Sequence, residues 1–212
     1  RDRGGDWSSD VCSSDLGVST AHRIFKQATN STPFKITLVS PNTDFYWNMA
    51  SPRGIIPGQI EDEKLFQPIS AGFDQYPAGQ FEFVLGYAES LDVDAKRVKV
   101  SNNITLDYDL LILGTGTNAK EGMPFKGVGS TEATKDLLHD FQEKVAKAEK
   151  IVICGAGVTG VEVAGELGFE YGQKKKIILV RVKRPKALSP ANTRSSEVHQ
   201  QFSKAVQQVY RR

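Results

Sequence analysis

Residues 150–167 read K-I-V-I-C-G-A-G-V-T-G-V-E-V-A-G-E-L, and this stretch decides the fold. The apolar run 151–154 leads into Gly155, Gly157 and Gly160, and a helix-forming run follows. We expect a strand, a tight turn and a helix, because each glycine has a physical role. The first makes the turn, the second lets a phosphate approach the backbone, and the third seats the helix against the sheet. Free N–H groups and the dipole at the start of this helix then favour binding of a pyrophosphate.

The surroundings of this motif indicate a dinucleotide-binding unit. A bare G-x-G-x-x-G is weakly specific, but here an apolar strand precedes it and a second strand, residues 177–181, follows about 20 residues later. We therefore predict a βαβ unit in which the turn contacts the nucleotide. A glycine-rich turn without a ligand is the alternative. The predicted contact residues of the turn are Gly155, Gly157, Val158, Thr159 and Gly160.

Composition limits the class of protein. The 212 residues, 39% of them hydrophobic, can form one large or two small globular domains. A net charge of +2 with interspersed acids and bases gives no sign of a nucleic-acid surface, and no apolar run has the length of a membrane span. Cys12 and Cys154 form no C-x-x-C pair, and the three histidines lack ligand spacing. We therefore expect no metal site and no redox-active cysteine pair.

The first sixteen residues differ in character from the rest. Residues 6–16 match, codon for codon, the translation of a common sequencing-library adapter, so we expect residues 1–16 to be an artefactual or disordered leader. An ordinary polar leader is the alternative, because Ser, Asp and Gly also make disordered tails. On this interpretation the native sequence begins near Gly17.

Residues 17–39 look like the second half of a βαβ unit. A helix entered through Gly17 is expected over residues 17–27, and a short strand over residues 34–39. Its first strand and first glycines are missing, with the leader in their place. Tyr46 and Trp47 then stand beside a loop rich in Pro and Gly, where we expect them to pack under a sheet edge.

Short alternating strands and one buried strand follow. Alternation predicts a meander of strands, followed by a buried strand over residues 108–116, a helix over 131–148 and a last helix over 195–210. The fold class is therefore α/β, with two Rossmann-like dinucleotide-binding units, the first interrupted by a β-meander and truncated. The expected domains are residues 17–130 and residues 131–212, the second truncated at its C-terminus. The expected meander strands are 81–86, 88–93, 97–100 and 104–105.

Two dinucleotide-binding units separated by a meander resemble the flavoproteins with two such domains. The closest likeness is to apoptosis-inducing-factor-like oxidoreductases of fungal type, which are FAD-dependent pyridine nucleotide-disulphide proteins related to mitochondrion-associated inducer of death and ferroptosis suppressor. It covers residues 17–212. The stretches that carry it are residues 17–21, 36–42, 45–48 with Arg53, 114–116 and 155–167.

This resemblance implies FAD on the first unit and NAD(P)H on the second. Gly17 matches the last glycine of the FAD turn, and Ala88 matches a residue whose backbone contacts the adenine. Thr115 and Gly116 match a strand end that packs near the FAD pyrophosphate.

Two further positions of the FAD site depart from the family pattern or have a second interpretation. Ser40 stands where many relatives place an acidic ribose ligand, and Asn42 or Asp44 could replace that acid. Arg53 matches a basic residue near the flavin phosphates, although a loop arginine is also commonly solvated.

On the second unit the resemblance places Glu162 near the nicotinamide and flavin rings. The alternative is a glutamate in the first turn of the helix, favoured by the dipole. Arg181 follows the second strand, where a base accepts the 2′-phosphate of NADP and an acid would bind the ribose of NAD. A solvated basic loop is the alternative there.

The expected activity is hydride transfer from NAD(P)H to the flavin, with electrons passed on to a quinone, oxygen or another small acceptor. The cofactors carry this chemistry, so no catalytic side chain is assigned. We expect this stretch of chain to bind FAD poorly and to have little or no activity. The alternative function is a pyridine-nucleotide-binding module without turnover. The expected location is the cytoplasm, with mitochondrial or membrane association only through segments outside the sequence, and no nucleic-acid partner.

Overall fold

The computed structural model describes residues 13–28, 34–117, 119 and 122–181. The chain divides into two compact units, residues 1–141 and 142–212, and each is treated separately below. The division lies inside helix α4 (Thr131–Lys147). The predicted helix over residues 195–210 lies outside the described residues, and the predicted domain limits stay a prediction.

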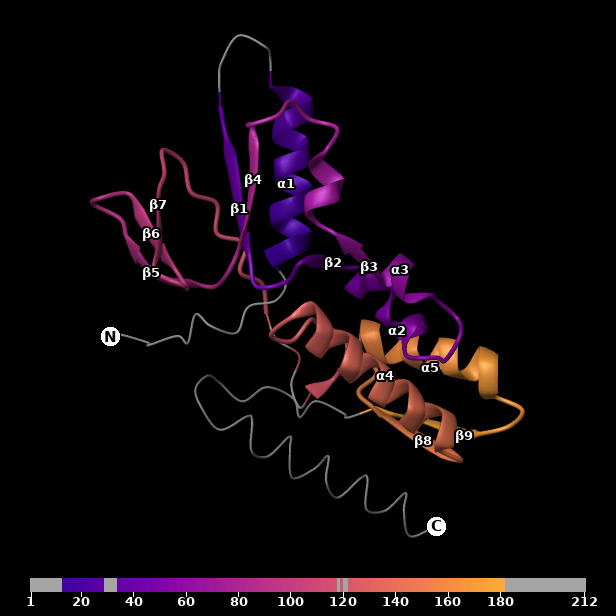
Figure 1. Cartoon of the computed structure of the whole chain (residues 1–212). Coiled ribbons are helices and arrows are strands. Elements are labelled where there is room, and N and C mark those ends of the chain that lie inside the picture. Colours follow the sequence, from indigo (N-terminus) through magenta and orange to yellow (C-terminus); the bar gives the residue numbers. More distant parts are fainter. Residues whose placement is uncertain (1–12, 29–33, 118, 120–121, 182–212) are drawn as a thin grey trace, which may run out of the picture. The chain divides into compact units, whose positions relative to one another are not determined.

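The first unit is built on a parallel pair of strands. β1 (Ile36–Ser40) and β4 (Phe81–Leu85) pair in register from the first residue of each strand to the last. Helix α1 (Ser13–Gln27) lies along β1 (Figure 1). The helix was expected to begin at Gly17, but it begins four residues earlier, in a stretch rich in Ser and Asp, which are common helix-starting residues. Gly17 thus lies one turn inside α1.

Small and aromatic side chains form the core between α1 and the strands. Ala21, Ile69 and Phe73 are buried together. The Phe73 ring stacks on His22 with 4.2 Å between ring centroids and on Phe81 with 3.8 Å. Gly17 allows a close approach in this packing, because a Cβ there would lie 2.9 Å from Cδ1 of Leu38 and that side chain would have to shift.

The segment between β1 and β4 is more ordered than the sequence analysis expected. β2 (Asp44–Tyr46) pairs antiparallel with β3 (Phe66–Pro68). Tyr46 is buried as predicted, stacks on Phe66 and donates its hydroxyl to the carbonyl of Pro124 at 2.6 Å. Trp47, however, is 47% exposed, so the prediction that it packs under a sheet edge is wrong. The short helices of this segment are η2 (Asn48–Ala50), α2 (Ser51–Gly54), α3 (Asp62–Leu65) and η3 (Ser70–Phe73).

The predicted meander has three strands, not four. β5 (Ala88–Asp92), β6 (Arg97–Val100) and β7 (Ile104–Asp107) form an antiparallel sheet. The stretch 81–86, expected as the first meander strand, instead supplies β4 of the parallel pair. Its sequence F-E-F-V-L places partly buried side chains on both faces, which suits a strand inside an α/β sheet.

Residues 108–116 do not form the buried strand that their sequence predicts. The structure assigns no strand to them, and Leu110 is 79% exposed and Leu113 53% exposed. A strand needs a neighbour to accept its backbone hydrogen bonds. Among the described residues no strand pairs with this segment.

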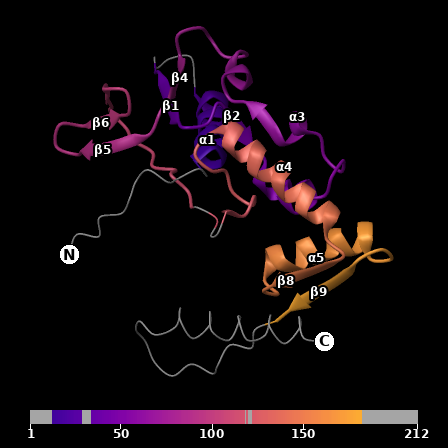
Figure 2. The same cartoon turned by 60° about the horizontal axis from the view of Figure 1, so that its bottom comes forward.

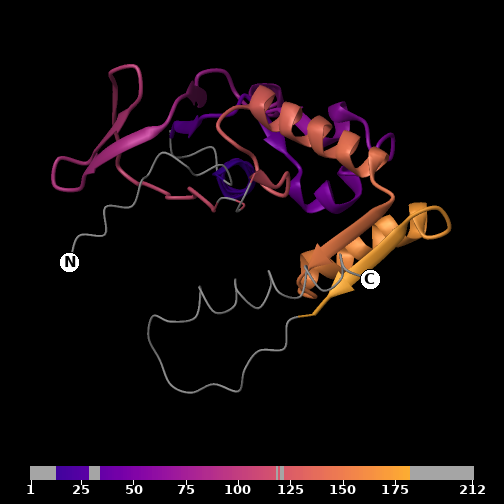
Figure 3. The same ribbon diagram turned by 90° about the horizontal axis from the view of Figure 1, so that it is seen from below.

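The second unit contains the predicted strand, turn, helix and strand. β8 (Lys150–Cys154) and β9 (Lys176–Val180) pair in parallel, and α5 (Val158–Tyr171) connects them and lies along both (Figure 2). The two strands are seen side by side in Figure 3. The predicted helix over residues 131–148 is present as α4, which ends one residue earlier.

Candidate functional site

The glycine turn between β8 and α5 has the geometry expected of a phosphate-binding turn. Gly155 has φ +108°, which side chains other than glycine rarely adopt, and its N–H donates to the carbonyl of Val180 at 3.0 Å. This bond ties the turn to the end of the neighbouring strand. The turn therefore sits at the carboxyl ends of two parallel strands, where nucleotides bind in open α/β sheets.

The other two glycines serve different purposes. A Cβ at Gly160 would collide with the carbonyl oxygen of Gly155, so glycine lets α5 approach the turn closely. At Gly157 a Cβ would meet nothing within 4 Å. The space in front of Gly157 is open, and the backbone there is accessible to a phosphate. The turn has room for a pyrophosphate at Gly157, and the predicted contact of its residues with the nucleotide stays a prediction.

The first turn of α5 offers its backbone N–H groups to an anion. Gly157 occupies the N-cap position in an extended conformation, makes no side-chain cap, and no acidic residue lies in the first turn. The N–H of Val161 already donates to the carbonyl of Gly157 at 3.0 Å. The N–H groups of Val158, Thr159 and Gly160 precede the first intrahelical bond and are the ones left for a ligand.

Glu162 and Arg181 are both exposed. Glu162 lies beyond the first turn of α5, so its interpretation as a dipole-stabilised first-turn glutamate is wrong: the helix starts at Val158 and its first turn holds no acid. Arg181 directly follows β9, as predicted. Cys154, at the end of β8, is exposed, and partial desolvation by its surroundings raises the pKa of its thiol.

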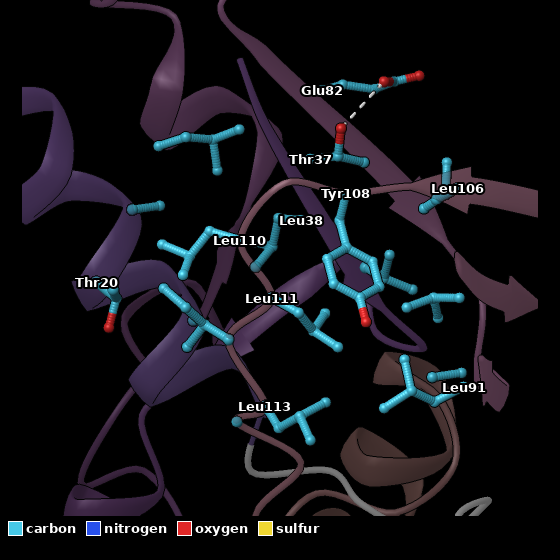
Figure 4. A pocket seen from close by; sticks show the side chains of 18 of the residues that line it. Thr20, Thr37, Leu38, Glu82, Leu91, Leu106, Tyr108, Leu110, Leu111 and Leu113 are labelled. Carbon is cyan, nitrogen blue, oxygen red and sulfur yellow. Dashed lines mark hydrogen bonds between the residues drawn. The ribbon is translucent and has the colours of Figure 1, made fainter. Parts of the chain in front are cut away.

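In the first unit, three predicted FAD residues line one cavity. Gly17 of α1, Ala88 of β5 and Thr115 line a cavity of about 1230 Å³, together with residues 36–39 of β1. Thr37 and Leu38 are among the lining side chains labelled in Figure 4. The sequence analysis missed Thr20, which also lines the cavity. Its position three residues after Gly17, on the same helical face, is the signal that could have identified it.

Ser40 and Asn42 lie at the carboxyl end of β1 and are 1% and 5% exposed. The hydroxyl oxygen of Ser40 accepts the backbone N–H of Asn42 at 3.1 Å. The Asn42 side-chain amide has no hydrogen-bond partner among the described residues. A buried amide without a partner carries a desolvation cost, and a ligand hydroxyl would relieve it. This favours Asn42, among the candidates named from sequence, as the residue that replaces the acidic ribose ligand.

The remaining predicted residues lie elsewhere in the first unit. Asp44 forms the start of β2, and its backbone N–H donates to the hydroxyl of Thr131 at 3.1 Å. Arg53 lies exposed in α2 and does not line the cavity. Gly116 has φ +74° and follows the cavity-lining residues. The structure therefore brings together Gly17, Ala88 and Thr115 around one cavity. The other predicted FAD residues do not line it: Ser40, Asn42, Asp44, Arg53 and Gly116.

Two classes of feature are missing from the described part of the chain. Within it, no group of three or more His, Cys, Asp or Glu side chains could share a metal ion. Each helix there is too short or too polar to cross a membrane.

A strand, a glycine turn with an open backbone and a helix whose N-terminus lacks a cap define a dinucleotide-binding α/β protein. The model of the pyridine nucleotide-disulphide oxidoreductase family matches residues 17–208. The chain belongs to this family, whose members are FAD- and NAD(P)H-dependent oxidoreductases.

Individual proteins agree with this assignment. Oxidoreductase ptaL of Pestalotiopsis fici is 57% identical over 169 residues, which cover 77% of this chain and 45% of that protein. Ferroptosis suppressor protein 1 of Taeniopygia guttata is 29% identical over 146 residues, covering 69% and 37%. The chain thus spans less than half the length of these relatives.

A solved structure shares the fold. The sulfide:quinone oxidoreductase of Aquifex aeolicus superposes with a TM-score of 0.54 at 24% identity, over 76% of this chain and 39% of that one. The predicted α/β class with FAD- and NAD(P)-binding units is confirmed.

Proposed function

We propose that the protein containing this chain is an FAD-dependent NAD(P)H oxidoreductase that passes electrons to a quinone or another small acceptor. The observation that carries the proposal is the Gly155–Gly160 turn, which presents an open backbone and an uncapped helix N-terminus to a pyrophosphate. Family membership supports the redox chemistry.

The residues of the second unit have distinct roles in this proposal. The N–H groups at the start of α5 hold the NAD(P)H pyrophosphate, and Gly157 lets it approach. Arg181 stands after β9, where its guanidinium favours the 2′-phosphate of NADPH over the bare ribose of NADH. Glu162 is exposed on α5 and is the residue proposed to face the nicotinamide and flavin rings.

The first unit would hold FAD, with the buried amide of Asn42 bonding the adenosine ribose. Gly17 lets α1 pack closely against Leu38 of β1. A bound FAD would accept the hydride from NAD(P)H and pass the electrons on. Arg53, Ala88, Thr115 and Gly116 are proposed to border it.

The acceptor and the location are proposals as well. The structural neighbour that shares the fold is named for a quinone, and this supports a quinone-like acceptor. We propose a cytoplasmic location and an apoptosis-inducing-factor-like type, the latter supported by relatives named apoptosis-inducing factor homolog and ferroptosis suppressor protein.

The substitution Gly157→Asp tests the nucleotide site. Asp is a preferred N-cap residue, and the backbone of Gly157 is extended with open space at its Cβ, so the free energy of unfolding is expected to stay the same or to rise by roughly a few tenths of a kcal/mol. The added carboxylate would repel the pyrophosphate. We expect the Kd for NADPH, measured by quenching of nicotinamide fluorescence, to rise at least about tenfold, equivalent to about 1.4 kcal/mol.

The matched control is Gly157→Ala, which adds a methyl group without charge; the methyl should obstruct the approach of the pyrophosphate and raise the Kd, but by less than Gly157→Asp, which adds charge repulsion as well. Equal weakening by Ala and Asp would contradict the electrostatic role of this position. Turnover is tested by adding FAD and a soluble quinone to the protein and following the oxidation of NADPH by its absorbance. Binding of both NADPH and FAD without any oxidation of NADPH would favour the nucleotide-binding module instead.

A further inference from the structure

Lysines gather at the end of the second unit where its two strands begin. Residues 142–150 and 169–176 hold six lysines and three glutamates, which gives them a net charge of +3, whereas the whole chain carries +2. All six lysines are exposed except Lys175, which is partly buried. We call these six residues the lysine end: Lys144, Lys147, Lys150, Lys174, Lys175 and Lys176.

Backbone pairing and one side chain bring these lysines together. Lys150 and Lys176 are register partners at the first positions of β8 and β9. The ammonium of Lys175 donates to the carbonyls of Ala146 and Ala148, each at 2.7 Å, and so holds the end of α4 against the start of β9. The end of α4, the start of β8 and the loop from α5 to β9 therefore lie together (Figure 2).

Most of the lysine end has no acidic partner. Lys147 forms an ion pair with Glu143 at 2.7 Å. Four of the others form no ion pair with any residue that the structure describes: Lys144, Lys150, Lys174 and Lys176. Like charges at paired positions of neighbouring strands repel each other, so the pairing of Lys150 with Lys176 weakens the fold. The stability of the second unit gives no reason for this arrangement, whereas an anionic partner does.

An exposed aromatic side chain stands beside the lysine end. Phe169 lies in the last turn of α5 and is 90% exposed. The connection from α5 to β9 is tight, because the N–H groups of Lys174 and Lys175 both donate to the carbonyl of Tyr171, at 2.8 and 2.7 Å. Phe169 is therefore close to the lysines along a short, ordered stretch of chain. Its ring would gain free energy by entering an apolar medium.

An anionic lipid bilayer suits this combination better than a protein or a nucleic acid. Protein interfaces are depleted of lysine, and arginine is the usual residue where carboxylates or phosphates are bound in a fixed geometry. The basic residues of the lysine end are all lysines. Lysine stays hydrated and attracts headgroups as a point charge, and clusters of about four to eight basic residues are typical of surfaces that bind anionic lipids. An exposed phenylalanine beside lysines is typical of segments that lie on a bilayer.

We propose that the lysine end is a contact surface for an anionic bilayer. The lysines attract the headgroups, and the Phe169 ring enters the boundary between headgroups and acyl chains. The sequence analysis expected membrane association only through segments outside the sequence, whereas this contact lies within the described chain. β8 and β9 are five residues long, so about 16 Å of strand separates the lysine end from the nucleotide turn. The proposal does not rest on the proposed oxidoreductase activity.

The test measures binding of the 212-residue chain to sedimented lipid vesicles, in reductant and without cofactors. The chain should bind phosphatidylcholine vesicles that contain about 30% phosphatidylserine, at about 0.1 M NaCl, and should bind vesicles of phosphatidylcholine alone much less. A lysine near an anionic surface contributes about fivefold to the partition coefficient. The triple variant Lys150→Gln, Lys174→Gln and Lys176→Gln should therefore lower that coefficient about 100-fold. Phe169→Ala should lower it about fivefold by removing the apolar contact.

A matched triple variant controls for the loss of charge. Lys26→Gln, Lys64→Gln and Lys96→Gln remove the same charge from exposed positions of the first unit, and should change the partition coefficient less than about threefold. Raising the salt to about 1 M shortens the Debye length to about 3 Å and should release the parent chain. Circular dichroism of each variant should match that of the parent.

Four results would overturn the proposal. The first is that the parent chain does not bind the vesicles that contain phosphatidylserine. The second is an equal loss of binding in the two triple variants, and the third is unchanged binding in the variant of the lysine end. The fourth is tighter binding to a short DNA duplex than to the vesicles, lost in the same variant, which would make the lysine end a nucleic-acid site.

Discussion

At the scale of single residues, the glycines of the second unit show how a sequence motif determines the local backbone geometry. The sequence assigned separate roles to Gly155, Gly157 and Gly160, and the structure gives each a separate physical reason: a positive φ, an open approach and a close contact. These roles could be predicted because a short motif fixes local backbone geometry. The burial of Asn42 could not, because it depends on residues far away in the sequence.

Gly160→Ala tests the close contact between α5 and the turn. The new methyl group would collide with the carbonyl oxygen of Gly155, so we expect the free energy of unfolding to fall by about 1–3 kcal/mol in urea titrations. The matched control is Gly165→Ala in the same helix, where a Cβ meets nothing within 4 Å. That change should stabilise the chain by up to about 1 kcal/mol through helix propensity. Similar effects of the two substitutions would contradict the steric argument.

His22 makes the stability of the first unit depend on pH. Its pKa is lowered by burial and by the nearby Lys26, while its ring stacks on Phe73 and its Nδ1 lies 2.9 Å from the Tyr76 hydroxyl. Around and below about pH 6.5 the unfolded chain binds the proton more readily than the folded chain. Neutral His22 therefore contributes to the free energy of unfolding above that pH. This contribution is lost as the pH falls through the pKa of His22 in the folded chain, which is the lower of the two.

The variant His22→Phe keeps a ring against Phe73 and removes the titration. We expect the urea midpoint of the parent chain to fall, relative to that of the variant, between pH 7.5 and pH 5.5. The other titrating groups are common to both chains and cancel in the difference. A constant difference across this range would show that His22 does not carry the pH dependence.

At the scale of elements, the sequence predicted what depends on local pattern and missed what depends on pairing. The strand–turn–helix–strand of the second unit was predicted because apolar periodicity and glycine positions are both local. Residues 81–86 were assigned to the meander, but the structure pairs them with β1. The alternation of apolar and polar residues predicts a strand without indicating which other strand it pairs with. Residues 108–116 have a strand's composition but no described partner, and composition alone cannot supply one.

At the scale of the whole molecule, two compact units each contain a parallel strand pair with a helix against it. This duplication was predictable from the sequence, since each half has its own strand and helix pattern. The assignment of one cofactor to each unit comes from the family resemblance. It remains a proposal that ligand-dependent protection can test.

Hydrogen exchange in the presence of each nucleotide tests the assignment of cofactors to units. NADPH should protect the amides of residues 157–161 and leave those near Asn42 unchanged, because only the first group belongs to the α5 turn. FAD should protect the amides near Asn42 and leave those of residues 157–161 unchanged. Protection of the Asn42 region by NADPH alone would contradict the proposed division.

The exposed run from Leu110 to Leu113 also affects how the chain is handled by chaperones and proteases. Apolar residues beside unpaired backbone resemble the surface of an incompletely folded protein, which chaperones and proteases recognise and which promotes aggregation. A chain of this sequence by itself should therefore be prone to aggregation and to proteolysis at this segment.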